Sequence, residues 1–288
     1  MLRFTLVIPT LERTMELETL FASLAAQEYE GFDCVVVDQN GDERLAGTIE
    51  RWQRAFPILR LQCAKGVSRA RNCGLLHATG DIVAFPDDDC WYPLDLLKEV
   101  AEWFSLHPAF DILTVGAKDE RGAPSGNRWI RDVCEISAMN AFRTTFCSSM
   151  FIRRTETFRR FRFDEAIGPG AGTRYGCGEE TDYILQRLGH GERGYFSRAL
   201  SVGHPVRDML SGQVTRERAA AYGNGMGYVL RQHSLGVLGA AFVAYDLLRS
   251  MAVTVKGDFR AAALCLQHGW GIATGFLTAP TGSGVRSR

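Results

Sequence analysis

The chain has 288 residues, of which 46% are hydrophobic and 23% charged, and its 33 basic and 33 acidic side chains balance. This composition indicates a globular protein with a sizeable core, and the lack of excess positive charge argues against a nucleic-acid partner. The eight cysteines are dispersed without a Cys-x-x-Cys pair, which favours thiols in a reducing compartment over disulfides or a zinc site.

The N-terminal half alternates between apolar, β-rich runs and helical patterns. Strands are predicted at 4–10, 34–38, 58–63 and 82–85, and helices between them at 17–24, 49–56 and 68–77. Near-continuous apolar runs such as 34–37 are typical of parallel strands that are buried on both faces. We therefore expect an α/β fold, with a mostly parallel central sheet flanked by helices.

Polar residues follow the predicted strands at their carboxyl ends. Thr10 ends the first strand, Asp38 ends the second, and Asp87, Asp88 and Asp89 follow the fourth. Ligands of open parallel sheets bind at this edge. In extended backbone Asp87 and Asp89 point the same way and Asp88 the other way, so the outer pair can share Mg²⁺ or Mn²⁺. The alternative interpretation is a solvated acidic turn before a helix.

A basic helix N-terminus is predicted at the same edge. The segment Gly66–Gly74 opens a helix and carries Arg69 and Arg71 in its first turns. The positive end of a helix, with added arginines, suits a phosphate group. The alternative is that the arginines only solvate the helix surface.

The C-terminal third is basic and helical. From residue 206 onward nine Lys and Arg residues stand against four Asp and Glu. Helical patterns cover 215–232, 235–255 and 259–277, and the middle one is apolar nearly all round. Such helices either lie on an anionic membrane surface or pack on the α/β domain or on a second subunit, and the sequence leaves both open.

With these elements in order, the sequence resembles the family 2 glycosyltransferases of GT-A fold that act in bacterial polysaccharide or O-antigen assembly. The matching segments are Leu6–Thr10, Val36–Asp38, Gly66–Asn72, Phe85–Asp89, Phe163–Glu165, Gly168–Gly172, Gly178–Asp182 and Val202–Pro205. We expect a catalytic domain at 1–210, with a nucleotide-sugar half (1–115) and an acceptor half (116–210). A helical region at 211–280 and a disordered tail at 281–288 would follow.

The resemblance implies roles for individual residues at the donor end. Pro9, Thr10 and Asp38 would hold the nucleotide, with Arg71 near it and Asp88 at the ribose or sugar.

The resemblance also implies the metal ligands. Asp87 and Asp89 would bridge Mn²⁺ or Mg²⁺ to the diphosphate of the donor, and His204 would complete the metal shell. Gln39 stands where the family usually has a second aspartate after Asp38.

Glu180 falls where the family usually has an aspartate and would be the general base, with Glu179 and Asp182 as alternatives. A sugar that leaves a diphosphate needs a cation for the developing negative charge and a base for the incoming hydroxyl. A single base with in-line displacement means inversion at the anomeric carbon.

These expectations describe an inverting, metal-dependent hexosyltransferase. Its donor would be a nucleotide sugar, with UDP as the expected nucleotide, and its acceptor would be a glycan or a lipid-linked molecule. We expect it in the cytoplasm or peripherally on the inner face of the cytoplasmic membrane, and a homodimer is compatible with the sequence. The alternatives are a nucleotidyltransferase of related fold and a non-catalytic, membrane-associated glycan-binding or scaffold protein.

Overall fold

The computed structural model describes residues 1–125, 129–130, 133–205 and 215–280, which fall into two compact units. The first unit contains Met1–Phe163 and Tyr183–Val206, and the second contains Asp164–Asp182 and Arg207–Arg288. The domain boundaries expected from the sequence stay a prediction. The expected disordered tail, 281–288, lies outside the described residues.

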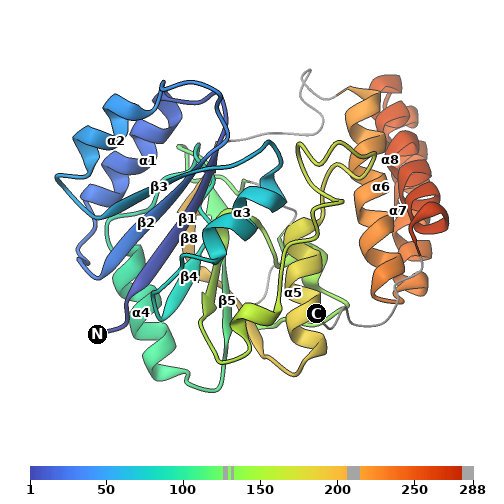
Figure 1. Ribbon diagram of the computed structural model, residues 1–288. Helices are drawn as coiled ribbons and strands as arrows, with labels where there is room; N and C mark the ends of the chain where they lie inside the picture. The colour runs from blue at the N-terminus through green and yellow to red at the C-terminus, as the bar shows by residue number, and fades with distance from the viewer. Residues whose placement is uncertain (126–128, 131–132, 206–214, 281–288) are drawn as a thin grey trace. The chain divides into compact units, whose positions relative to one another are not determined.

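The first unit is built on an eight-stranded sheet with the strand order β3-β2-β1-β4-β7-β5-β8-β6 (Figure 1). Its strands are β1 (Phe4–Thr10), β2 (Phe32–Asp38), β3 (Ile58–Gln62), β4 (Ile82–Ala84), β5 (Ile112–Lys118), β6 (Cys134–Glu135), β7 (Met150–Arg153) and β8 (Gly194–Gly203). The helices are α1 (Met15–Ala25), α2 (Ala46–Trp52), α3 (Val67–Leu75) and α4 (Leu96–Leu106), and α5 (Glu179–Gly189) begins in the second unit. Short 3-10 turns lie at Ala141–Arg143, Cys147–Ser149 and Phe158–Arg160.

The expected α/β class with a mostly parallel sheet is confirmed. Strand β1 pairs in parallel with β2 and β4, β2 with β3, and β5 with β8. Strand β7 runs antiparallel between β4 and β5, and β6 runs antiparallel to β8. The sequence did not indicate these reversed strands, because an apolar run shows that a strand is buried but not its direction.

The core forms where the apolar runs of the N-terminal strands meet the helices. All seven residues of β1 are buried, as expected for a strand covered on both faces. Helix α3 approaches β1 so closely that a Cβ atom on Gly74 would lie 2.3 Å from Cγ1 of Val7. A glycine at this position is therefore a packing requirement.

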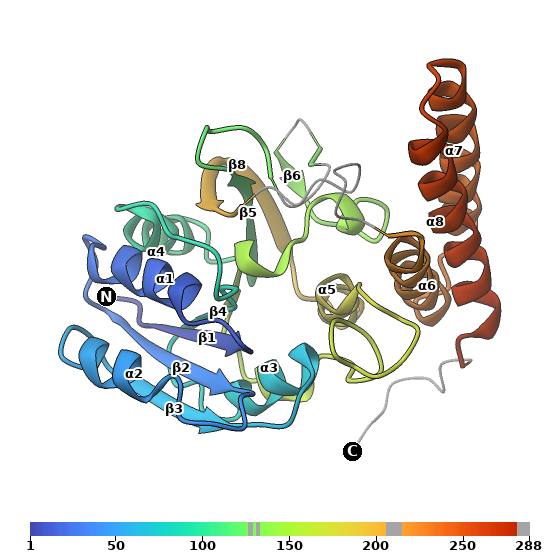
Figure 2. The same cartoon turned by 90° about the horizontal axis from the view of Figure 1, so that it is seen from above.

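The strand register brings polar residues to one edge of the sheet. Thr10 lies opposite Asp38, and Asp38 lies opposite Gln62, at the carboxyl ends of β1, β2 and β3. The ends of β1 and β2 lie side by side in Figure 2. Strand β4 stops earlier, with Ala84 opposite Leu6, so the following residues continue along this edge.

The second unit contains three long helices, α6 (Arg216–Gln232), α7 (Gly236–Val255) and α8 (Phe259–Thr278) (Figure 1). These match the helices expected from the sequence. Helix α8 packs on both α6 and α7. Its contact with α6 is lined by glycines. A Cβ atom on Gly227 would lie 2.2 Å from the Ile272 carbonyl oxygen, and a Cβ atom on Gly275 would lie 2.2 Å from the Asn224 carbonyl oxygen. The two helix backbones therefore touch directly.

We expect Gly74→Ala to destabilise the protein by about 1–3 kcal/mol, since the added methyl group overpacks a rigid, β-branched Val7. Urea denaturation followed by tryptophan fluorescence would measure the change. Gly47→Ala in α2 is the matched control, because no atom lies within 4 Å of its new methyl group. A neutral Gly74→Ala variant would contradict the packing argument.

Candidate active site

The three consecutive aspartates lie in a turn that is tied to the end of β8. The turn closes where the Cys90 amide donates to the Asp87 carbonyl oxygen at 3.1 Å. Trp91 then pairs with Gly203 through two backbone hydrogen bonds of 3.0 and 2.8 Å. A Cβ atom on Gly203 would lie 1.9 Å from the Trp91 indole. This pairing brings the residue after Gly203 beside the aspartates.

Asp87, Asp89 and His204 form a candidate metal centre. One ligand atom from each lies within 4.8 Å of the others, and Nε2 of His204 is 3.6 Å from Oδ1 of Asp89. Nδ1 of His204 lies 2.8 Å from the Pro205 carbonyl oxygen. Because a carbonyl oxygen only accepts, Nδ1 donates this hydrogen bond, and Nε2 is the ring nitrogen that faces Asp89. Two carboxylates and an imidazole in this arrangement fit a divalent cation such as Mn²⁺.

Arginine side chains offset the negative charge of the aspartates. Nη2 of the buried Arg71 lies 3.0 Å from Oδ1 of Asp87, whose other oxygen accepts a hydrogen bond of 2.6 Å from Ser148. Nη1 of Arg13 lies 2.6 Å from Asp88 and 2.9 Å from Asp89. The acidic turn is therefore a paired, partly buried site and not a solvated surface turn.

The middle carboxylate, Asp88, shares its arginine partner with Asp89. The side chains of Asp88 and Asp89 are 8% and 7% exposed, and both pair with Nη1 of Arg13, so a separate role for Asp88 stays a prediction. Burial raises the pKa of the Asp88 carboxyl to about 6, although Arg13 and a hydrogen bond from Thr10 favour its charged form.

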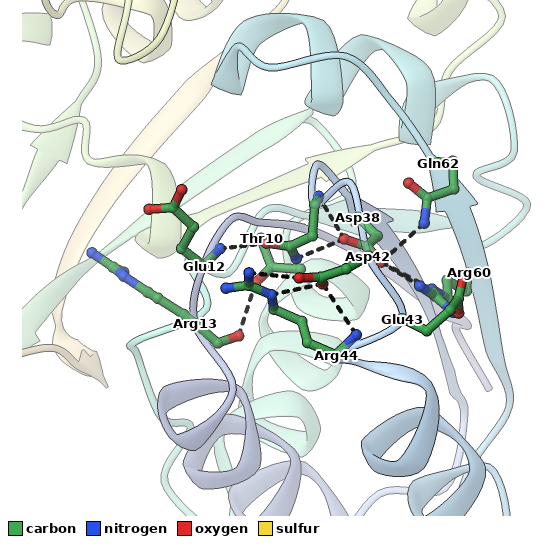
Figure 3. Close-up of polar contacts among 10 residues, drawn as sticks. Thr10, Glu12, Arg13, Asp38, Asp42, Glu43, Arg44, Arg60 and Gln62 are labelled. Carbon is green, nitrogen blue, oxygen red and sulfur yellow. Dashed lines mark hydrogen bonds and ion pairs between the residues drawn. The ribbon is translucent and has the colours of Figure 1, made fainter.

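Asp38 is the centre of a second polar cluster, at the ends of β2 and β3 (Figure 3). Its side chain is 0% exposed. Oδ2 accepts hydrogen bonds from Nε and Nη2 of Arg60, at 3.0 and 2.7 Å, and one of 3.1 Å from Gln62. Oδ1 accepts from the backbone and side-chain nitrogens of Asn40 at 2.8 and 2.7 Å. Arg60 also pairs with Glu43 at 2.6 Å.

These contacts occupy both oxygens of Asp38, so the carboxylate organises the rim of the sheet. Its contact with a nucleotide stays a prediction, as do those of Pro9 and Thr10, which are buried at the end of β1. Gln39 accepts a hydrogen bond of 2.8 Å from the Gly66 amide. It thereby joins the end of β2 to the N-terminus of α3.

The three candidate bases lie in the first turn of α5, in the second unit. Glu179 and Asp182 are buried, whereas Glu180 is partly exposed. Oδ1 of Asp182 is 2.7 Å from Nε2 of His233, the residue that follows α6. Glu180 is therefore the most accessible carboxylate of the three.

Helix α6 supports the chain segment that leads into α5. The Gly176 amide donates to the Ala221 carbonyl oxygen at 2.9 Å, and the Tyr228 hydroxyl donates to Asp164 at 2.6 Å. A Cβ atom on Gly225 would lie 2.1 Å from the Cys177 carbonyl oxygen. The segment 164–182 therefore rests directly on the α6 backbone.

Several polar residues at these sites were not expected from the sequence, namely Arg13, Asn40, Arg60, Gln62, Ser148 and His233. The position of Arg13 shortly after the first strand is a weak signal, because residues there lie at the ligand edge. Gln62 ends β3, one residue before the end of the predicted strand 58–63, and could have been found by the same reasoning. Ser148 and His233 carry no local signal.

The sequence of this chain is similar to those of known proteins. Residues 5–168 match the family described as Glycosyl transferase family 2. The succinoglycan biosynthesis protein ExoM of Rhizobium meliloti is 28% identical over 206 residues, which are 67% of this chain and 64% of ExoM. The poly(ribitol-phosphate) beta-N-acetylglucosaminyltransferase TarS of Staphylococcus aureus is 28% identical over 131 residues, 43% of this chain and 23% of TarS. The chain thus spans less than two thirds of either relative.

Two solved structures share the fold. TarS residues 1–349 with UDP-GlcNAc superpose with a TM-score of 0.60 at 16% identity, over 98% of each chain. The mannosyltransferase PcManGT of Pyrobaculum calidifontis, with GDP-Man and Mn²⁺, gives a TM-score of 0.65 at 15% identity, over 96% of this chain and 87% of the other. The fold of this chain is therefore the GT-A fold.

We expect Gly203→Ala to weaken Mn²⁺ binding about tenfold to a hundredfold, as loss of the support of a ligand commonly does. The methyl group would displace the Trp91 indole and shift His204. Calorimetric titration of Mn²⁺ would measure the affinity. Gly116→Ala in β5 is the control, because its nearest neighbour would be at an ordinary 3.5 Å. Equal affinities of both variants and wild type would contradict the assignment of His204.

We expect Gly225→Ala to raise the rate of tryptic cleavage after the exposed Arg174 about tenfold or more, because overpacking against Cys177 loosens the segment that α6 supports. Gly239→Ala in α7 is the control, since its methyl group would meet Leu230 at 3.5 Å. Unchanged cleavage in Gly225→Ala would show that α6 does not support the segment.

Proposed function

Because the chain belongs to glycosyl transferase family 2, we propose that it is an inverting, metal-dependent hexosyltransferase that acts on a nucleotide sugar. The observation that carries this proposal is the convergence of Asp87, Asp89 and His204 at the carboxyl edge of a GT-A sheet. UDP is the proposed nucleotide. The acceptor is a glycan or lipid-linked glycan of bacterial polysaccharide biosynthesis, which is consistent with the names of ExoM and TarS.

The donor diphosphate would bind between the acidic turn and its neighbouring cations. Asp87, Asp89 and His204 would hold Mn²⁺ or Mg²⁺, which when bound supplies Lewis-acid stabilisation of the leaving diphosphate. Arg13 and Arg71 lie within 3.0 Å of these carboxylates, so they keep the turn in place and limit its charge repulsion.

Glu180 is the proposed general base. The acceptor oxygen forms a bond to the anomeric carbon while the bond from that carbon to the diphosphate oxygen breaks. The hydroxyl proton passes to the Glu180 carboxylate, the nucleoside diphosphate leaves, and the configuration is inverted. A base must be reachable by the acceptor, and this favours the partly exposed Glu180 over the buried Glu179 and over Asp182, which pairs with His233.

We expect Glu180→Gln to lower kcat about 10²- to 10⁴-fold, because the acceptor hydroxyl loses its proton acceptor, while UDP affinity stays the same. Release of nucleoside diphosphate from a panel of sugar donors, with Mn²⁺ and a membrane extract as the acceptor source, would measure the rate. Glu217→Gln is the control, since Glu217 is exposed at the start of α6. Full activity in Glu180→Gln would move the base to Glu179 or Asp182.

The same assay tests the reaction class. Asp89→Asn and addition of EDTA should each abolish release of the nucleoside diphosphate. Release of pyrophosphate in the presence of a sugar phosphate would instead identify a nucleotidyltransferase. If no donor is cleaved and UDP does not bind in a metal-dependent way, the proposed transfer is wrong and a scaffold role remains.

A further inference from the structure

Helix α7 exposes an uncharged half to its surroundings. All of its 20 residues are described, and the exposed ones are Val237, Ala240, Ala241, Ala244, Tyr245, Leu247, Leu248, Met251, Ala252, Thr254 and Val255. At the helical angle of 100° per residue, these positions cover about half of the helix circumference. A helix face in contact with water normally carries charged side chains, so this face is unusual.

The charged residues of α7, of α8 and of the connection between them lie away from this face or at its end. Asp246 is buried, with Oδ2 2.6 Å from Nδ1 of His268 on α8. Arg249 is partly exposed, and Lys256 and Arg260 are exposed where α7 joins α8. Asp258 lies in the same connection, where it accepts a hydrogen bond of 2.9 Å from the Ala261 amide and caps α8. The uncharged face is therefore bordered by a positive charge excess.

Helix α8 adds a narrower apolar stripe. Its exposed large side chains are Phe259, Leu266, Trp270 and Leu277. The spacings of seven, four and seven residues place all four on one side of the helix. Tryptophan and tyrosine, here Trp270 and Tyr245, are side chains that favour the boundary between lipid and water.

We propose that the exposed faces of α7 and α8 bind the surface of an anionic lipid bilayer, with the helices in the plane of the membrane. An apolar face bordered by Lys and Arg is the pattern of interfacial helices. The partner is a lipid surface because the bordering cations complement anionic headgroups. The proposal is independent of the sugar transferred.

Two other occupants fit the observations less well. Among the described helices α7 is the one long and apolar enough to cross a membrane, with a mean hydropathy of 1.4 and 22% of that stretch buried in the protein. Crossing would separate α7 from α8. Two contacts join these helices: Asp246 pairs with His268, and the Ser250 hydroxyl donates to the Ala262 carbonyl oxygen. A coiled-coil seam with a second copy would be a narrow stripe flanked by charges, whereas the α7 face is broad and uncharged.

The test is sedimentation of the full chain with vesicles of phosphatidylcholine alone or mixed with phosphatidylglycerol. We expect binding to the mixed vesicles, and a loss of about tenfold or more in Leu248→Glu/Met251→Glu, because two carboxylates enter the apolar contact. Leu106→Glu is the matched control, since Leu106 is 77% and Leu248 66% exposed but Leu106 ends α4. UDP binding and helical circular dichroism would verify folding of each variant.

The charge requirement has its own variant. Arg249→Gln/Lys256→Gln/Arg260→Gln should weaken binding to phosphatidylglycerol vesicles about tenfold or more and make it insensitive to salt. Absence of vesicle binding by the wild type, or equal binding by Leu248→Glu/Met251→Glu, would overturn the proposal. If the wild type does not bind vesicles but forms a dimer, and this dimer dissociates in Leu248→Glu/Met251→Glu, the face would belong to a contact with a second copy. Because this assay needs no sugar transfer, its failure is distinct from failure of the proposed enzyme activity.

Discussion

Mutual repulsion of three neighbouring carboxylates is the constraint around which the first unit is arranged. Asp87, Asp88 and Asp89 follow a buried strand, so they cannot separate freely into water. Arg13 and Arg71 arrive from two other elements and pair with all three. Arg71 reaches the turn from α3, which packs closely on β1, and the end of β8 adds His204 beside Asp89. A divalent cation would complete this compensation, which is why charge balance and chemistry converge at one place.

The strands and the acidic turn were predictable from the sequence because their signals are local. An apolar run reports burial, and three aspartates after it report charge, without knowledge of the rest of the chain. The reversed direction of β7 was not predictable, since it depends on where the chain returns to the sheet. The same holds for Ser148 and His233, whose partners lie 61 and 51 residues away in the sequence.

Resemblance to a family predicted more of the candidate site than pattern reasoning did, but it predicted positions and not contacts. It indicated His204, and the structure brings this residue to Asp89 through the pairing of Trp91 with Gly203. It indicated Asp38 as a nucleotide ligand, whereas the hydrogen bonds from Arg60 fill one of its oxygens. These hydrogen bonds could not be predicted, because Arg60 looks like an ordinary residue on an edge strand.

The second unit is assembled from two separate stretches of the chain, and this limits where relatives can exchange sequence. The segment 164–182, which carries the proposed base, packs with residues after 206 although β8 and most of α5 separate them in sequence. A recombination event at residue 210 would therefore divide a single packed module. A chimaera that exchanges the second unit between relatives must transfer two separate pieces of sequence together. Glycines such as Gly225, at which the pieces touch, would have to match in both parents.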